Sequence, residues 1–145
     1  MRLRNIRALC VASMGFACLA SSGGEKLPAM PKLPFAFAEA TEIAFRSIRG
    51  EKTEFTITDK AEIARLSKLI VLKRKEPCKC EHIETATFRK GKAEIYVHFC
   101  SHCFVVRHGR RNYDHRMPTG FYPAYQKLLE QHRQEAAKGQ AAAQE

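Results

Sequence analysis

The alternation of hydrophobic and polar residues predicts two strands followed by a helix in the first half of the folded region. Residues 42–49 alternate polar and apolar side chains, as a strand with one buried face does. A second strand is expected at 54–57, beyond a turn. Asp59 is suited to cap the following helix, and Glu62, three residues later, would close a capping box. The helix then places apolar residues at the spacing of one buried face: Ile63, Leu66, Leu69 and Ile70.

A hairpin is expected around Gly91. Glycine readily takes the positive φ that a type I turn followed by a bulge requires. In that register Ile83 faces Val97 on an apolar side that the helices would cover. The opposite side of the hairpin would then carry Cys80 directly across from Cys100.

These elements predict an α+β domain: an antiparallel sheet of about five strands with two helices packed on one face, in the order β-β-α-β-β-β-α. The strand after the hairpin is expected where residues 104–106 read Phe-Val-Val. The second helix is expected at about 120–136. Its inner side would carry Phe121, Tyr125, Leu128, Leu129 and His132. The single folded domain would span 41–133.

The first twenty residues have the pattern of a secretory signal peptide. Residues 1–7 contain three arginines and no acidic residue, and residues 8–20 carry no charge. That uncharged run is too short to cross a bilayer as a helix. We expect cleavage after Ala20, with a second candidate site after Ala38, and export to the periplasm, the cell envelope or the medium. Residues 21–40 read as a Pro/Gly-rich tether and 134–145 as a disordered or frayed tail.

Composition narrows the classes of function. The chain has 145 residues, with 25 Lys and Arg against 15 Asp and Glu. This basic excess favours contact with anionic partners. For an exported protein we expect an anionic envelope surface or polymer, and no nucleic acid. The two aspartates, Asp59 and Asp114, make a site of paired aspartates improbable, and no P-loop, G-x-S-x-G or H-E-x-x-H motif occurs. A non-catalytic protein is therefore expected.

Cysteine and histidine residues gather on both sides of the hairpin. They form a C-x-C-x-H array and an H-x-C-x-H-C array: Cys78, Cys80 and His82, then His98, Cys100, His102 and Cys103. Zinc prefers four tetrahedral sulfur or nitrogen ligands, and two such arrays on neighbouring strands resemble the spacing of a zinc ribbon. The first array departs from the usual C-x-x-C. The seven residues are candidate ligands, with zinc as the expected ion.

Disulfides are the alternative interpretation of the same cysteines. After removal of the signal peptide an even number of cysteines would remain in an oxidising compartment. Cys80–Cys100 and Cys78–Cys103 bridges would then staple a small domain, without a metal. The two interpretations remain open on the sequence alone.

Thiol redox chemistry is a third interpretation. The run Cys100-Ser101-His102-Cys103 resembles the C-x-H-C site of periplasmic disulfide oxidoreductases. That family places the first cysteine at the start of a helix, whereas here strand-forming residues follow at 104–106. The family's distant cis-proline has no counterpart in this sequence.

The wider pattern resembles small exported bacterial domains without an assigned activity. The resemblance rests on Thr56-Ile57-Thr58-Asp59 before a short helix, then the C-x-C, a charged hairpin and a Tyr-Leu-Leu helix. It covers about residues 43–130. It implies an α+β fold and no particular function.

Overall fold

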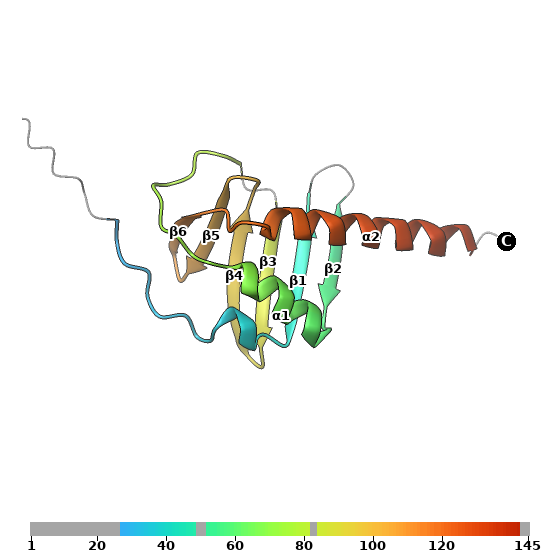
Figure 1. Ribbon diagram of the computed structural model, residues 1–145, viewed down its shortest axis with the longest axis horizontal. Helices are drawn as coiled ribbons and strands as arrows, with labels where there is room; N and C mark the ends of the chain where they lie inside the picture. Colours follow the sequence, from blue (N-terminus) through green and yellow to red (C-terminus); the bar gives the residue numbers. More distant parts are fainter. Residues whose placement is uncertain (1–26, 49–51, 82–83, 143–145) are drawn as a thin grey trace, which may run out of the picture.

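The computed structural model describes residues 27–48, 52–81 and 84–142 (Figure 1). It confirms the α+β class: a single antiparallel sheet with strand order β2-β1-β3-β4-β5-β6 carries two helices on one face. The elements along the chain are η1 (Phe37–Glu39), β1 (Glu42–Ser47), β2 (Thr53–Ile57), α1 (Lys60–Leu69), β3 (Glu84–Lys90), β4 (Ala93–Phe99), β5 (Cys103–His108), β6 (Arg111–Arg116) and α2 (Phe121–Ala142). The sheet thus has six strands where about five were expected.

The additional strand is β6, whose sequence, Arg-Asn-Tyr-Asp-His-Arg, contains no aliphatic residue. It follows β5 through a tight turn in which Gly109 has a φ of 60°. Tyr113 and His115 pair with Val106 and Phe104, and all four are buried. Directly paired residues share one face of a sheet. Tyr113 and His115 therefore occupy buried positions on the face that aliphatic residues fill in the central strands.

Helix α1 begins as the sequence predicts. The Asp59 side chain accepts a hydrogen bond of 2.8 Å from the backbone N–H of Glu62. The Glu62 carboxylate does not close the expected box but accepts from Arg65 Nε at 2.9 Å. Ile63 and Leu66 are fully buried, so the predicted apolar face is the one that packs on the sheet.

The register of the hairpin between β3 and β4 differs from the expected one. Gly91 has a positive φ of 59°, but it stands at the first position of a two-residue turn with Lys92. Lys90 therefore pairs with Ala93. Glycine at the first central position, with no positive φ at the second, is the type II′ arrangement, which joins two strands without a bulge.

This register inverts the predicted faces of β3. Ala86 and Phe88 are fully buried against the helices, whereas Thr85 and Thr87 are only half-buried. Ile83, which was expected to face the core, lies outside the described residues. Val97 pairs with Ala86, three residues from the expected partner, and a shift by an odd number of residues moves every side chain of the strand to the opposite face.

The folded unit begins earlier and its last helix ends later than the sequence indicates. Phe35 and Phe37, within the expected tether, are buried in the main core, and Ser67 Oγ donates to the Phe37 carbonyl at 3.0 Å. Helix α2 continues to Ala142, through most of the expected tail. None of the described helices is long and apolar enough to span a membrane.

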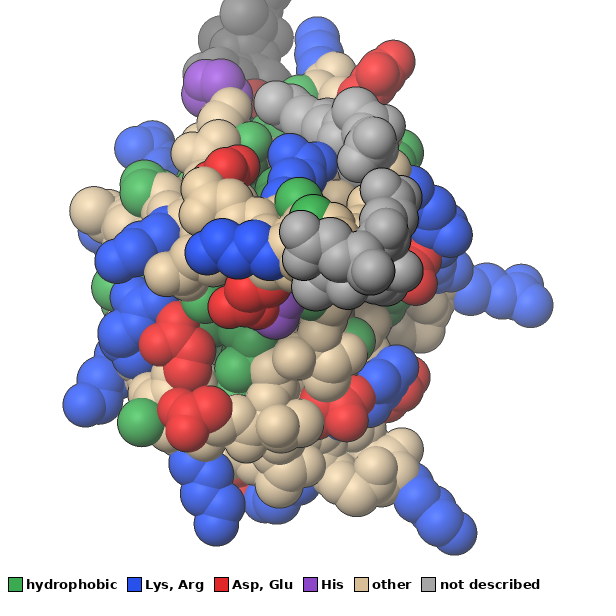
Figure 2. Space-filling view, turned by 90° about the vertical axis from the view of Figure 1, so that its right-hand side faces the viewer, with side chains coloured by type: hydrophobic (Ala, Val, Ile, Leu, Met, Phe, Trp, Pro, Cys, Tyr) green, Lys and Arg blue, Asp and Glu red, His purple; other side chains and the backbone are tan. Residues whose placement is uncertain are grey.

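The two edge strands of the sheet, β2 and β6, have different surroundings. Figure 2 looks onto the β2 side, where basic and acidic side chains are spread over the surface and hydrophobic ones form only small separate areas. Arg46 and Lys52 both pair with Glu54 there. At the other edge, the chain that follows α1 lies beside β6 (Figure 1). That segment leads to Cys78 and Cys80.

Candidate metal-binding site

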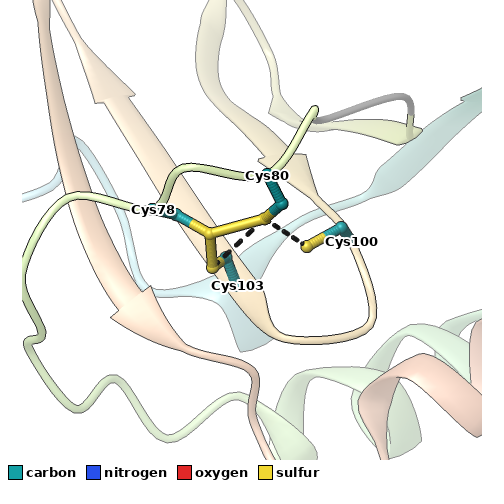
Figure 3. Close-up of side chains that lie close together, drawn as sticks. All are labelled: Cys78, Cys80, Cys100 and Cys103. Atoms are coloured by element: carbon teal, nitrogen blue, oxygen red, sulfur yellow. Dashed lines mark hydrogen bonds between the residues drawn. A yellow bond between two sulfur atoms is a disulfide. The ribbon is translucent and has the colours of Figure 1, made fainter.

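Four cysteines from two separate parts of the chain converge at one end of the sheet (Figure 3). Cys78 and Cys80 come from the segment between α1 and β3, Cys100 follows β4, and Cys103 is the first residue of β5. All four Sγ atoms lie within 4.8 Å of one another. Tetrahedral zinc with bonds of ~2.3 Å to sulfur would hold its ligands about 3.8 Å apart. Cys80 Sγ lies 2.8 Å from Cys100 Sγ and 3.5 Å from Cys103 Sγ, so the sulfurs would move slightly apart to hold one ion between them.

The segment before Cys78 is fixed by backbone pairing with β6. The N–H of Arg116 donates to the Lys73 carbonyl at 2.9 Å, and the N–H of Lys75 donates to the Asp114 carbonyl at 3.1 Å. The Asp114 carboxylate then accepts from the N–H of Cys78 at 2.9 Å. These bonds position Cys78 and Cys80 near the end of β5, beside Cys100 and Cys103.

The cysteines form a small packing cluster of their own. Cys100 is 3% exposed and Cys103 is fully buried, whereas Cys78 and Cys80 are half-buried. All four pack with Val105, apart from the main core. Val105 and Cys103 alternate along β5 with Phe104 and Val106, which face the helices. The cluster therefore lies on the opposite face of the sheet from the helices.

Two hydrogen-bond donors are directed at sulfur. The backbone N–H of His102 approaches Cys100 Sγ at 3.5 Å, and Lys75 Nζ approaches Cys103 Sγ at 3.5 Å. Donors of this kind stabilise a thiolate more than a neutral thiol, because the hydrogen bond is to the charged form. Four metal-bound thiolates on one Zn²⁺ carry two net negative charges, which the Lys75 ammonium partly offsets.

The contacts between sulfurs are compatible with more than one bonding state. Cys78 Sγ lies within bonding distance of both Cys80 and Cys103, with Cα separations of 5.6 Å and 6.4 Å. A sulfur forms one disulfide, so these two bonds are alternatives and do not coexist. Cys80 Sγ lies 2.8 Å from Cys100 Sγ. The cluster thus accommodates one metal ion, or the pair of bridges Cys78–Cys103 and Cys80–Cys100.

The candidate histidines are placed differently from the cysteines. Among the described residues, the group with converging ligand atoms contains only the four cysteines. His102 is exposed, and its Nδ1 lies 2.8 Å from Ser101 Oγ. The His98 ring packs edge-on against Tyr96, with ring centroids 4.8 Å apart. His82 lies outside the described residues.

The C-x-H-C run does not have the setting of a redox site. Cys100 precedes a turn that its own N–H closes by donating to the Cys103 carbonyl at 3.0 Å, and a strand follows where oxidoreductases have a helix. Both sulfurs of the run are buried. An attacking thiolate needs access to its partner and a helix N-terminus or comparable positive field.

Two contacts of buried titratable groups elsewhere in the fold were not indicated by the sequence. The Tyr125 hydroxyl donates to Glu84 Oε2 at 2.6 Å inside the core, and burial together with this carboxylate raises the pKa of Tyr125. His115 is 1% exposed, and burial, followed by the nearby Arg74 charge, lowers its pKa. Both contacts join distant parts of the chain, so no local spacing could have revealed them.

The chain matches no protein family, no curated protein and no solved structure. The assignment of function therefore rests on the geometry of the cysteine cluster and on the distribution of charge.

Proposed function

We propose that this protein is an exported, non-catalytic binding module whose four cysteines hold one zinc ion. The observation that carries the proposal is the convergence of four Sγ atoms from two chain segments within 4.8 Å. Two pairs of ligands held by different segments are typical of structural zinc sites, in which the metal joins parts of the chain that the core leaves apart.

The ligand set favours zinc over other ions and argues against catalysis. Four thiolates are soft ligands that suit Zn²⁺ in tetrahedral geometry, with Cu(I) as the competing ion. Catalytic zinc sites have three protein ligands and leave a position open for water or substrate. A site with four cysteine ligands has no such position. Its role would be to hold the segment from Lys73 to Cys80 against the sheet.

A disulfide-stapled envelope domain without metal is the second candidate. It is favoured by the bonding distance between Cys78 and Cys103 and the close approach of Cys80 to Cys100. Export, which we infer from the basic start and the uncharged run at 8–20, would place these cysteines in an oxidising compartment. In this alternative Lys75 would lie beside neutral sulfur.

Zinc and thiol content of the mature protein, purified from the periplasm without added metal, tests the proposal. We expect one equivalent of zinc, and four thiols that react once the protein is denatured with a chelator. Cobalt(II) should replace the zinc and give thiolate-to-cobalt charge-transfer absorption. Protein with neither zinc nor reactive thiols would overturn the proposal in favour of the disulfide alternative.

Substitutions test which residues are metal ligands and which only lie beside the site. Cys103→Ser should abolish stoichiometric cobalt binding, whereas His102→Ala, which alters the exposed residue beside it, should leave the cobalt spectrum unchanged. Circular dichroism of each variant shows whether the fold is retained. Equal loss of cobalt binding in His102→Ala would contradict a site of four cysteines.

A further inference from the structure

Two adjoining hollows lie beside the cysteine cluster, one on each side of Arg116 and Met117. The first, of about 770 Å³, lies between the segment 74–76 and the turn at 101–102. The second, of about 440 Å³, lies between the end of α1 and the residues that precede α2. Arg116 and Met117 line both, so the two hollows share a wall, and together they are called the groove. Each hollow is of the size of ordinary ligand pockets, roughly 300–1,000 Å³.

The side chains that line this groove are predominantly basic. Its lining includes five basic residues and one acidic residue: Lys68, Lys73, Arg74, Lys75 and Arg116, with Glu76. The groove also adjoins the start of α2, because Pro118 and Thr119 line it, and a helix N-terminus adds positive partial charge.

The basic side chains of the groove are not neutralised by acids of the protein. Over the described residues, the side chains of Lys68, Lys73 and Arg116 make no ion pair or hydrogen bond with the protein, and all three are exposed. Elsewhere basic residues do have acidic partners: Arg65 pairs with Glu62 and Lys90 with Glu39. Unpaired cations along a concave surface focus positive potential and attract anions.

The lining also indicates which anion the groove suits. In the described part of the chain, no Phe, Tyr or Trp lines either hollow. Single-stranded nucleic acid is usually bound by aromatic side chains on which bases stack, in addition to basic residues. The hydrophobic exposure is limited to isolated residues such as Val71, at 59%, and Leu27, at 39%, rather than to an amphipathic face that would insert into lipid.

We propose that this groove binds a linear polymer of phosphate groups, and that it contacts the phosphates without reading bases or inserting into lipid. The inference gives the proposed binding module a class of partner, yet it does not depend on zinc. Lys75 links the two features, because it lines the groove and its ammonium approaches Cys103 Sγ.

Fluorescence anisotropy with end-labelled inorganic polyphosphate tests the groove. The protein sample is the mature chain, with its zinc and thiol content measured beforehand, so that a failure of the metal proposal is recorded separately. We expect affinity to fall linearly with salt on a log–log scale. Lys73→Gln and Arg116→Gln should each weaken binding severalfold and lower the salt slope by about one.

The matched control is Lys92→Gln, which removes the same charge from the exposed tip of the β3–β4 turn. It should leave affinity and salt slope unchanged. Equal weakening by Lys92→Gln and Lys73→Gln would mean attraction to overall charge and would overturn the assigned site. Tighter binding of a single-stranded oligonucleotide of equal charge, or binding only to vesicles of anionic lipid, would overturn the phosphate polymer as partner.

Discussion

The effects of a reductant and of a chelator on the Tm should distinguish the two bonding states of the cysteine cluster. A reductant should lower the Tm only if the cysteines form disulfides, and a chelator only if they hold a metal. If Cys78 and Cys103 are bridged, the crosslink joins residues separated by 25 positions. The chain-entropy relation then gives a stabilisation of about 3.5 kcal/mol at 25 °C. For a domain of 60–100 residues, each kcal/mol corresponds to about 4–8 °C in Tm. A reductant should therefore lower the Tm by roughly 14–28 °C.

If the cluster holds zinc, the same reductant should leave the Tm unchanged. A chelator should instead lower it by at least as much as the disulfide estimate, because the free energy of structural zinc binding contributes directly to folding, ~10–16 kcal/mol in small peptides. The main core lies on the other face of the sheet and contains none of the cysteines. We therefore expect the metal-free chain to remain folded at low temperature, with a lower Tm.

The assay is thermal unfolding followed by far-ultraviolet circular dichroism, with and without a phosphine reductant and with and without a chelator. A Tm that falls with the reductant alone would refute the zinc proposal. A Tm that is insensitive to both reagents would refute the reasoning altogether, because the cluster would then contribute nothing to holding the segment from Lys73 to Cys80 in place.

Three further predictions concern parts of the structure outside the cluster. Tyr125→Phe removes the donor to buried Glu84 and should lower the free energy of unfolding by about 1.5–3 kcal/mol in urea titrations; an unchanged midpoint would contradict the contact. Gly91→Val should cost about 1–3 kcal/mol, because φ is positive there, yet leave the zinc content unchanged, since the turn is at the far end of the hairpin from Cys100. His115 has a lowered pKa, so the unfolded chain takes up a proton first as pH falls. The stability present above about pH 6.5 should then be lost as the pH falls below that value, by at most about 1.4 kcal/mol per pH unit, and His115→Gln should flatten this dependence in unfolding titrations.

Helices and caps could be predicted because their signals are local. Asp59, Ile63 and Leu66 lie within eight residues of one another, and helical spacing alone determines which side of α1 is buried. The end of α2 was placed too early, since the helix continues from the predicted end at 136 to Ala142 and residues 137–141 are all exposed, which leaves no hydrophobic pattern to indicate it.

The register of β3 and β4 was wrong because one glycine fits two kinds of turn. Gly91 has the expected positive φ, but a bulged turn and a two-residue turn give opposite faces to the same strand. The hydrophobic pattern did not decide between them, because β3 alternates threonine with Glu84, Ala86 and Phe88. Burial of a glutamate on the core side depends on Tyr125, 41 residues away, whose hydroxyl satisfies its carboxylate.

The cysteines converge as predicted, although not through the predicted pairing of Cys80 with Cys100 across the hairpin, because β3 begins only at Glu84. Cys100 follows β4 directly and Cys103 begins β5, so both stay at one end of the sheet whichever residues pair. The position of Cys78 could not be derived in the same way. It depends on single backbone hydrogen bonds between the segment at 73–75 and β6, which have no signature in sequence.

The docked segment also protects an edge of the sheet, and this links the chemistry of the cluster to the integrity of the fold. An exposed edge strand offers unpaired backbone groups to other chains, and proteins cover or charge such edges. At β2 the edge is charged (Figure 2), whereas at β6 the segment from Lys73 to Lys75 supplies the backbone partners. Only a few hydrogen bonds hold that segment there. Cys78 and Cys80 follow that segment. Joined to Cys100 and Cys103 through metal or sulfur, they would supply the restraint that those few bonds lack.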